Sequence, residues 1–365
     1  MPLRPCFPGP YNAAVQKAVP PGTGSFQSRH RQFSLPICRG DEMVKFNMAP
    51  TARRIVEQVL DVKEGELVLL VTDSDRPASV TEALAHALSA AGAKLSVMHM
   101  PPHMNGGIDP LPHVGAAMAA SEVVILQTSF ATIHTETARN ALREGARVLD
   151  MWGWREDMMV AGGALADYDE VARVTRTISD IYTEAKTGRF TTPDGCDMEF
   201  SLEGRTCFPL IGVARKSGEF AACPDGEAAM SPLEGTSNGV MVNPFSIERK
   251  DLGFVTEPIR LEIKDGKVAS ITGSAAADRF WKLLDENGDL AKNVAEFAIG
   301  TNPACRPRET MREAKKTWGT CHMAVGDSGS IGGVVEAPLH IDMIFDNPTV
   351  WADEQMIIQD GKILV

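Results

Sequence analysis

The sequence lacks the patterns that mark several large classes of protein. It has no apolar run long enough to span a bilayer, and no Gly-x-Gly-x-x-Gly follows the first expected strand, so nothing supports a membrane partner or a dinucleotide cofactor. Its seven cysteines form no Cys-x-x-Cys pair. This spacing suggests neither a zinc knuckle nor a disulfide framework and favours a reducing, cytoplasmic setting. A formal net charge of -12 argues against a nucleic-acid partner, because such partners are usually bound by basic surfaces.

Residues 1–47 differ from the rest of the chain and carry no predicted chemistry. Seven prolines interrupt this segment, and it lacks the apolar core of a secretory signal. Its scarcity of acids is typical of an organelle transit peptide, but the prolines oppose the amphipathic helix that such a peptide needs. We therefore expect a loosely packed arm, or translation from Met43 or Met48.

Residues 48–187 show the alternation of an α/β domain. Short apolar runs predict strands at residues 66–72, 94–98, 123–126 and 146–149. Helical patterns occupy residues 80–91, 136–142 and about 168–186. Strands that alternate with helices predict a parallel sheet covered by helices on both faces, as in Rossmann-like domains.

Residues 188–365 have a different texture, which predicts an α+β domain. Residues 196–202 alternate between apolar and polar, and Asp265-Gly266 lies between two strand-like runs as a hairpin turn. A helix is expected at residues 275–284, and Asp360-Gly361 marks a second turn near the end of the chain.

The second half also contains side chains of the kinds that bind metals. His340 and Asp342 are two residues apart, so in an extended segment both point to the same face and can reach one ion. The other three are Glu227, Glu296 and His322, each set among small or apolar residues. Burying these groups is costly without a cation, and mixed nitrogen and oxygen ligands suit zinc, cobalt, manganese or ferrous iron.

These segments resemble the aminopeptidase T family of metallo-aminopeptidases and its relative, 2,5-dihydroxypyridine 5,6-dioxygenase, from about residue 50 onwards. The resemblance rests on four motifs in order: Pro224-Asp225-Gly226-Glu227, Ala295-Glu296 with Gly300-Thr301-Asn302-Pro303, Gly319-Thr320-x-His322-x-Ala324-x-Gly326, and His340-x-Asp342. It implies that Glu227, Glu296, His322, His340 and Asp342 bind a pair of divalent metals. It also implies a homodimer, with an α/β domain beside a metal-bearing domain.

The chain departs from both relatives. The aminopeptidases have an active-site tyrosine seven residues after the position of His322, where this chain has Gly329. The dioxygenase holds one ferrous ion with two histidines and an aspartate. His340 and Asp342 match two of these ligands, Glu296 stands at the position of the other histidine, and His322 has no counterpart. His134 resembles a histidine implicated in acid/base work in the dioxygenase, although capping of the following helix is the alternative.

Charge balance favours hydrolysis over ring cleavage. Three carboxylates oppose the +4 of two dications, and a shared water acidified to a pKa of about 7 can attack an amide-type bond. We therefore expect a dinuclear zinc, cobalt or manganese hydrolase for a small molecule or short peptide, with His134, Glu227 and Glu296 catalytic. The first alternative is a mononuclear Fe(II) ring-cleaving dioxygenase, in which His322, His340 and Asp342 can form the ligand triad. The second is an inactive, metal-stabilised binding protein. Glu234 is the alternative to Glu227 as a metal-binding glutamate.

Overall fold

The computed structural model describes residues 45–365 except 105–106, 134 and 250. The expected arm, residues 1–47, lies almost wholly outside the described residues. Within them, no helix is long and apolar enough to cross a bilayer.

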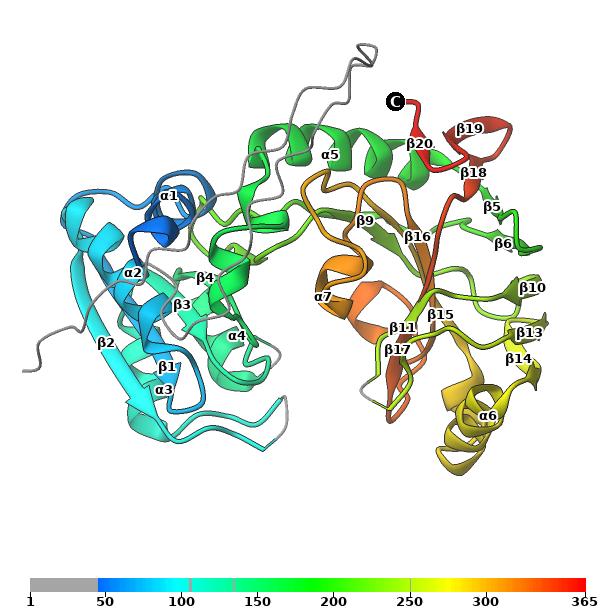
Figure 1. The fold of residues 1–365 in the computed structure, drawn as a ribbon, viewed down its shortest axis with the longest axis horizontal. Coiled ribbons are helices and arrows are strands. Elements are labelled where there is room, and N and C mark those ends of the chain that lie inside the picture. The colour runs from blue at the N-terminus through cyan, green and yellow to red at the C-terminus, as the bar shows by residue number, and fades with distance from the viewer. Residues whose placement is uncertain (1–44, 105–106, 134, 250) are drawn as a thin grey trace, which may run out of the picture. The chain divides into compact units, whose positions relative to one another are not determined.

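The predicted parallel sheet is present (Figure 1), and its strands pair parallel throughout. In spatial order they are β2 (Lys94–Met100), β1 (Leu67–Asp73), β3 (Val123–Gln127), β4 (Arg147–Asp150) and β8 (Phe220–Ala222). The edge strand β8 comes from beyond residue 187, so the chain returns to this sheet after starting its second half. The boundary near residue 187 stays a prediction.

Helices cover both faces of this sheet, because successive side chains of β1 and β3 point to opposite faces. On one face, Leu84 of α2 (Ala78–Ala90) packs in a cluster with Leu70 and Ile125. On the other, Met118 of α3 (Pro112–Ala119) packs in a cluster with Leu69 and Leu126. The remaining helical elements of this half are η1 (Lys45–Met48), α1 (Ala49–Arg54), the π-helical turn η2 (Ile55–Val59), α4 (Glu136–Arg143), η3 (Glu156–Met159), η4 (Gly163–Leu165) and α5 (Tyr168–Glu184).

The second half contains two antiparallel sheets, and this confirms the predicted α/β-then-α+β order. The eight-stranded sheet runs β14 (Lys267–Gly273), β13 (Ile259–Lys264), β10 (Asn238–Val242), β6 (Asp197–Ser201), β5 (Thr187–Thr191), β18 (Thr349–Ala352), β19 (Gln355–Gln359) and β20 (Lys362–Ile363). The seven-stranded sheet runs β12 (Gly253–Phe254), β11 (Ser246–Ile247), β17 (His340–Phe345), β16 (Cys321–Gly326), β15 (Val294–Gly300), β9 (Glu227–Met230) and β7 (Phe208–Leu210). The helical elements of the second half of the chain are α6 (Ala275–Glu286), η5 (Asp289–Lys292), α7 (Met311–Ala314) and η6 (Gly329–Ile331).

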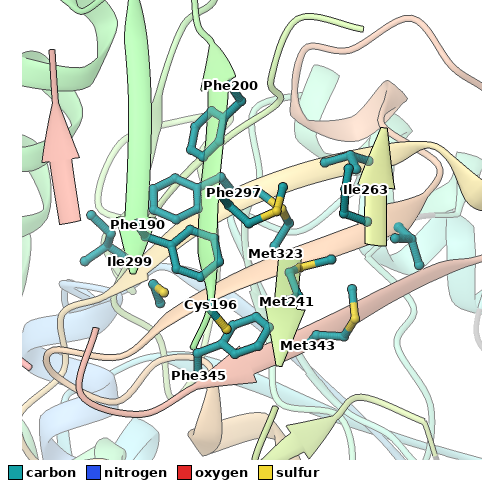
Figure 2. Packing of buried hydrophobic residues seen from close by; sticks show 14 of the residues in the cluster. Phe190, Cys196, Phe200, Met241, Ile263, Phe297, Ile299, Met323, Met343 and Phe345 are labelled. Carbon is teal, nitrogen blue, oxygen red and sulfur yellow. The ribbon is translucent and has the colours of Figure 1, made fainter. Parts of the chain in front are cut away.

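An aromatic and methionine-rich core lies between these two sheets (Figure 2). Phe190 of β5 stacks on Phe297 of β15 with ring centroids 5.7 Å apart, and Phe200 of β6 tilts against the same ring at 4.9 Å. Met323 and Met343 extend this core along β16 and β17. The seven-stranded sheet therefore has one face in the core, and the side chains between these residues point to its other face.

Candidate metal centre

The five predicted ligands lie on the face of the seven-stranded sheet that points away from the core. Along β15, β16 and β17 the core residues alternate with candidate ligands, so Glu296 precedes Phe297, His322 precedes Met323, and Asp342 precedes Met343. Side chains on a strand alternate between faces. The same period that fills the core therefore places the acids and imidazoles together on the opposite face.

Register and small residues make room for these side chains. Ala324 of β16 lies between Glu296 on β15 and Asp342 on β17, and Gly326 pairs with His340. The register shifts between Val294 and Glu296, an irregularity of the kind that re-aims side chains beside functional sites. Alanine and glycine at these positions leave the space above the sheet to the longer side chains.

Glu296 is the centre of the cluster. Its Oε1 is 3.3 Å from Nε2 of His322, and its Oε2 is 3.0 Å from Nε2 of His340. Nε2 of His340 is also 3.0 Å from Oδ1 of Asp342, while Nε2 of His322 is 3.7 Å from Oε2 of Glu227. The structure thus brings together all five residues that the sequence singled out.

The cluster contains two groups of three potential ligands, and Glu296 belongs to both. One group is Glu227, Glu296 and His322, and the other is Glu296, His340 and Asp342; within each, the donor atoms lie within 4.8 Å of one another. The triad of His322, His340 and Asp342 considered from the sequence is not among the groups found in the described chain. The register explains this, because His322 pairs with Ile344 and lies two residue pairs further along the strands than the pair of Ala324 and Asp342.

The charges in the cluster shift the pKa values of its members in opposite directions. Burial acts to raise the pKa of Glu296, but hydrogen bonds with His322 and His340 outweigh it and bring the pKa to about 2. Burial likewise acts to lower the pKa of His340, but Asp342 and Glu296 raise it well above its usual value. The Glu296 carboxylate is therefore ionised at neutral pH, as a metal ligand must be.

Two lysines and two further acids complete the site, and the sequence analysis did not assign them a role. Lys315 Nζ is 2.6 Å from both Asp342 Oδ2 and Glu248 Oε2. Lys316 Nζ is 2.8 Å from Asp225 Oδ1 and 2.5 Å from Glu227 Oε1. Asp225 stands in one of the motifs that carry the resemblance, whereas consecutive lysines are more typical of an exposed surface.

Exposure divides the cluster into an accessible side and a sealed side. The side chains of His340, Lys315 and Glu248 are 30%, 21% and 22% exposed. Those of His322, Glu227 and Lys316 are between 0% and 7% exposed. Among the five candidate ligands, His340 has the most exposed side chain, so a small molecule can reach the cluster most readily beside His340.

The residues fit a divalent metal. Donor atoms of Glu296, His340 and Asp342 lie within 4.8 Å of one another. Carboxylate oxygens and imidazole nitrogens are together the ligands that zinc, manganese and ferrous iron accept. The convergent carboxylates of the cluster are costly to bury without a cation.

The remaining predicted residues have simpler outcomes. His134 lies outside the described residues, and the N-cap of α4 is Thr135, whose side chain accepts from the Ala138 N–H. Glu234 pairs with Arg205 and accepts from the Val334 N–H, so Glu227 is the glutamate that reaches the cluster. In the segment without the family tyrosine, the Asp327 carbonyl lies 2.6 Å from Nδ1 of His340.

A parallel α/β sheet joined to antiparallel sheets with a buried His, Glu and Asp cluster defines a metal-binding enzyme. The chain belongs to the 2,5-dihydroxypyridine 5,6-dioxygenase family, whose model matches residues 51–365. This match confirms the relationship stated from the motifs. It favours the ring-cleaving alternative over the hydrolase that charge balance had placed first.

Solved structures share the fold. 2,5-Dihydroxypyridine dioxygenase from Pseudomonas putida KT2440 superposes with a TM-score of 0.76 at 16% identity, covering 89% of this chain and 99% of that one. AmpT from Thermus thermophilus superposes with a TM-score of 0.64 at 14% identity, covering 88% and 100%. No curated protein sequence matches the chain.

Proposed function

We propose that this protein is a metal-dependent dioxygenase that opens the ring of a hydroxylated pyridine or a related small aromatic molecule. The family match over residues 51–365 carries this proposal. The group of Glu296, His340 and Asp342 on the accessible side of the cluster supports it, because it offers three ligands where a small substrate can approach. A ring-cleaving dioxygenase incorporates both atoms of O₂ into its product and takes the electrons from the hydroxylated ring, so it needs no dinucleotide reductant.

The three ligands are held in place by their neighbours. A carbonyl only accepts hydrogen bonds, so the 2.6 Å contact with Asp327 puts the proton on Nδ1 of His340 and leaves Nε2 free to bind a metal. Lys315 occupies Oδ2 of Asp342 and leaves Oδ1 facing His340. A ferrous ion bound by these residues would supply a Lewis-acidic, redox-active centre with open positions for a chelating ring and dioxygen.

Proton transfer is assigned to His134, from the resemblance alone. His134→Ala should then slow turnover and leave the metal content unchanged.

Oxygen uptake is the direct test. Protein purified without oxygen and loaded with Fe(II) should consume one O₂ for each molecule of 2,5-dihydroxypyridine or a related dihydroxylated ring that loses its ring absorbance. Metal-loaded protein that consumes no oxygen with any such ring would contradict the proposal.

A hydrolase is the second candidate, and one observation favours it. The group of Glu227, Glu296 and His322 adjoins the first group and shares a carboxylate with it, as a dinuclear centre requires. Release of amine from aminoacyl amides would support this candidate. If neither reaction occurs and metal only raises the melting temperature, an inactive metal-stabilised binding protein is favoured. A homodimer remains a proposal from the resemblance.

A further inference from the structure

The sealed side of the cluster contains a cation of the protein's own. Lys316 is only 6% exposed, and its ammonium lies 2.8 Å from Asp225 Oδ1 and 2.5 Å from Glu227 Oε1. A buried ammonium is stable only when acids compensate it, and here two acids do so. One of these acids, Glu227, is also a member of the second potential metal group.

The two histidines of the cluster differ in the hydrogen bonding of Nδ1. A histidine that binds a metal through one nitrogen usually donates the other N–H to a carbonyl or carboxylate. His340 has this arrangement, with Nδ1 2.6 Å from the Asp327 carbonyl. Nδ1 of His322 is buried and has no partner in the described chain. The group with His340 is therefore built as a ligand set, whereas the group with His322 lacks this feature.

Charge counting is compatible with one ion and does not require two. The site has five acids, Asp225, Glu227, Glu248, Glu296 and Asp342, and two lysines, Lys315 and Lys316. Burial raises the pKa of Glu248 to about 7, so one dication leaves at most one negative charge of the site uncompensated. A second dication would have to bind Oε2 of Glu227, on the same carboxylate that already holds the ammonium of Lys316 on Oε1.

We propose that Lys316 limits this centre to one metal ion, because its ammonium takes the place of a second dication on the sealed side. The single ion is held by Glu296, His340 and Asp342, and Glu227 acts as the partner of Lys316. This inference rests on the proposed metal centre, but it applies to the number of ions and not to the substrate.

Metal counting on a lysine variant tests the inference. Wild-type protein, Lys316→Met and Lys315→Met are saturated with Mn(II) or Co(II), freed of excess ion, and analysed by elemental mass spectrometry. The wild type should hold one ion per chain. Lys316→Met should approach two, because Asp225 and Glu227 lose their cation and can accept another. Lys315→Met is the matched control, since it removes the neighbouring, half-buried lysine on the accessible side and should not rise above one ion per chain.

Two results would overturn the inference: two ions in the wild type, or a folded Lys316→Met protein that still holds one. If Lys316→Met does not fold, the wild-type count and Glu227→Gln decide. Glu227→Gln should keep its single ion at saturation, with a loss of affinity of no more than about 10–100-fold, as expected for a group outside the ligand set. Loss of an ion in that variant would make Glu227 a ligand and refute the proposal. Because these counts need neither oxygen nor an organic substrate, failure of the proposed ring cleavage would be recognised separately.

Discussion

Replacing Asp342 with asparagine should remove both an ion pair and a metal ligand while keeping the shape of the side chain. Asp342 is 2% exposed, and its carboxylate lies 2.6 Å from Lys315 and 3.0 Å from His340. Removing one partner of a buried pair costs about 3–5 kcal/mol. Glu248 still compensates Lys315 at 2.6 Å, so we expect roughly the lower end, about 3 kcal/mol, without metal.

The metal adds a second difference. An ion that binds only the folded protein stabilises it by about 2.7 kcal/mol when its concentration is 100 times its Kd. Asp342→Asn should lose this stabilisation by the metal. At a metal concentration 100 times the Kd, the free energies of unfolding of wild type and variant should therefore differ by about 6 kcal/mol. Urea unfolding with and without Mn(II) measures both values.

Asp346→Asn is a matched control for this prediction. Asp346 immediately follows β17 and pairs with Arg308 with 34% of its side chain exposed, so its loss should cost about 1 kcal/mol or less. The metal increment should remain. If Asp342→Asn showed the same metal increment as wild type, Asp342 would not be a ligand and the reasoning would fail.

Three further predictions concern geometry and pH. Gly326→Ala should lower the free energy of unfolding by at least 1–3 kcal/mol and weaken metal binding, because φ of Gly326 is +106° and an added Cβ would lie 2.1 Å from the Leu339 carbonyl oxygen. Gly235→Ala is the control in urea unfolding and metal titration, because a Cβ at Gly235 would have no atom within 4 Å. Equal losses in the two variants would contradict the packing argument. Burial, opposed by Arg312 and the Trp152 N–H, raises the pKa of Asp150 to about 6 from 3.8; the folded state therefore holds this proton more tightly, and stability falls as pH rises from about 4 to 6. Asp150→Asn should remove this pH dependence of the free energy of unfolding, which amounts to about 3 kcal/mol for roughly two pKa units. Urea unfolding at several pH values measures it, and identical pH profiles in wild type and variant would contradict the prediction. Metal binding requires a neutral imidazole, and the pKa of His340 is raised well above its usual value. The affinity for the metal should therefore fall about tenfold per pH unit on acidification for each proton displaced, which calorimetry at several pH values measures. A pH-independent metal affinity would exclude His340 as a ligand.

Local patterns predicted most of the elements. The turn at Asp265-Gly266 does separate two paired antiparallel strands, β13 and β14, and the helix expected at residues 275–284 is α6. These features depend on neighbours in the chain, which the sequence shows directly. The return of the chain to the first sheet through Phe220–Ala222 was not predicted, because three residues of strand show no periodicity and their pairing with β4 is set by tertiary structure.

Local patterns also predicted the ligands of the cluster, but they did not predict its lysines. His340 and Asp342 share a face because of strand geometry, and the motifs identified Glu227, Glu296 and His322. Lys315 and Lys316 escaped attention because lysine is rarely buried, and only the fold shows that acids from three separate segments surround them. The two lysines change the charge balance on which the preference for a dinuclear hydrolase rested.

Anomalous diffraction from metal-loaded crystals would locate the ion. We expect a peak about 2.0–2.2 Å from His340 Nε2 and from carboxylate oxygens of Glu296 and Asp342. A fully loaded protein with no peak at these three side chains would contradict this expectation.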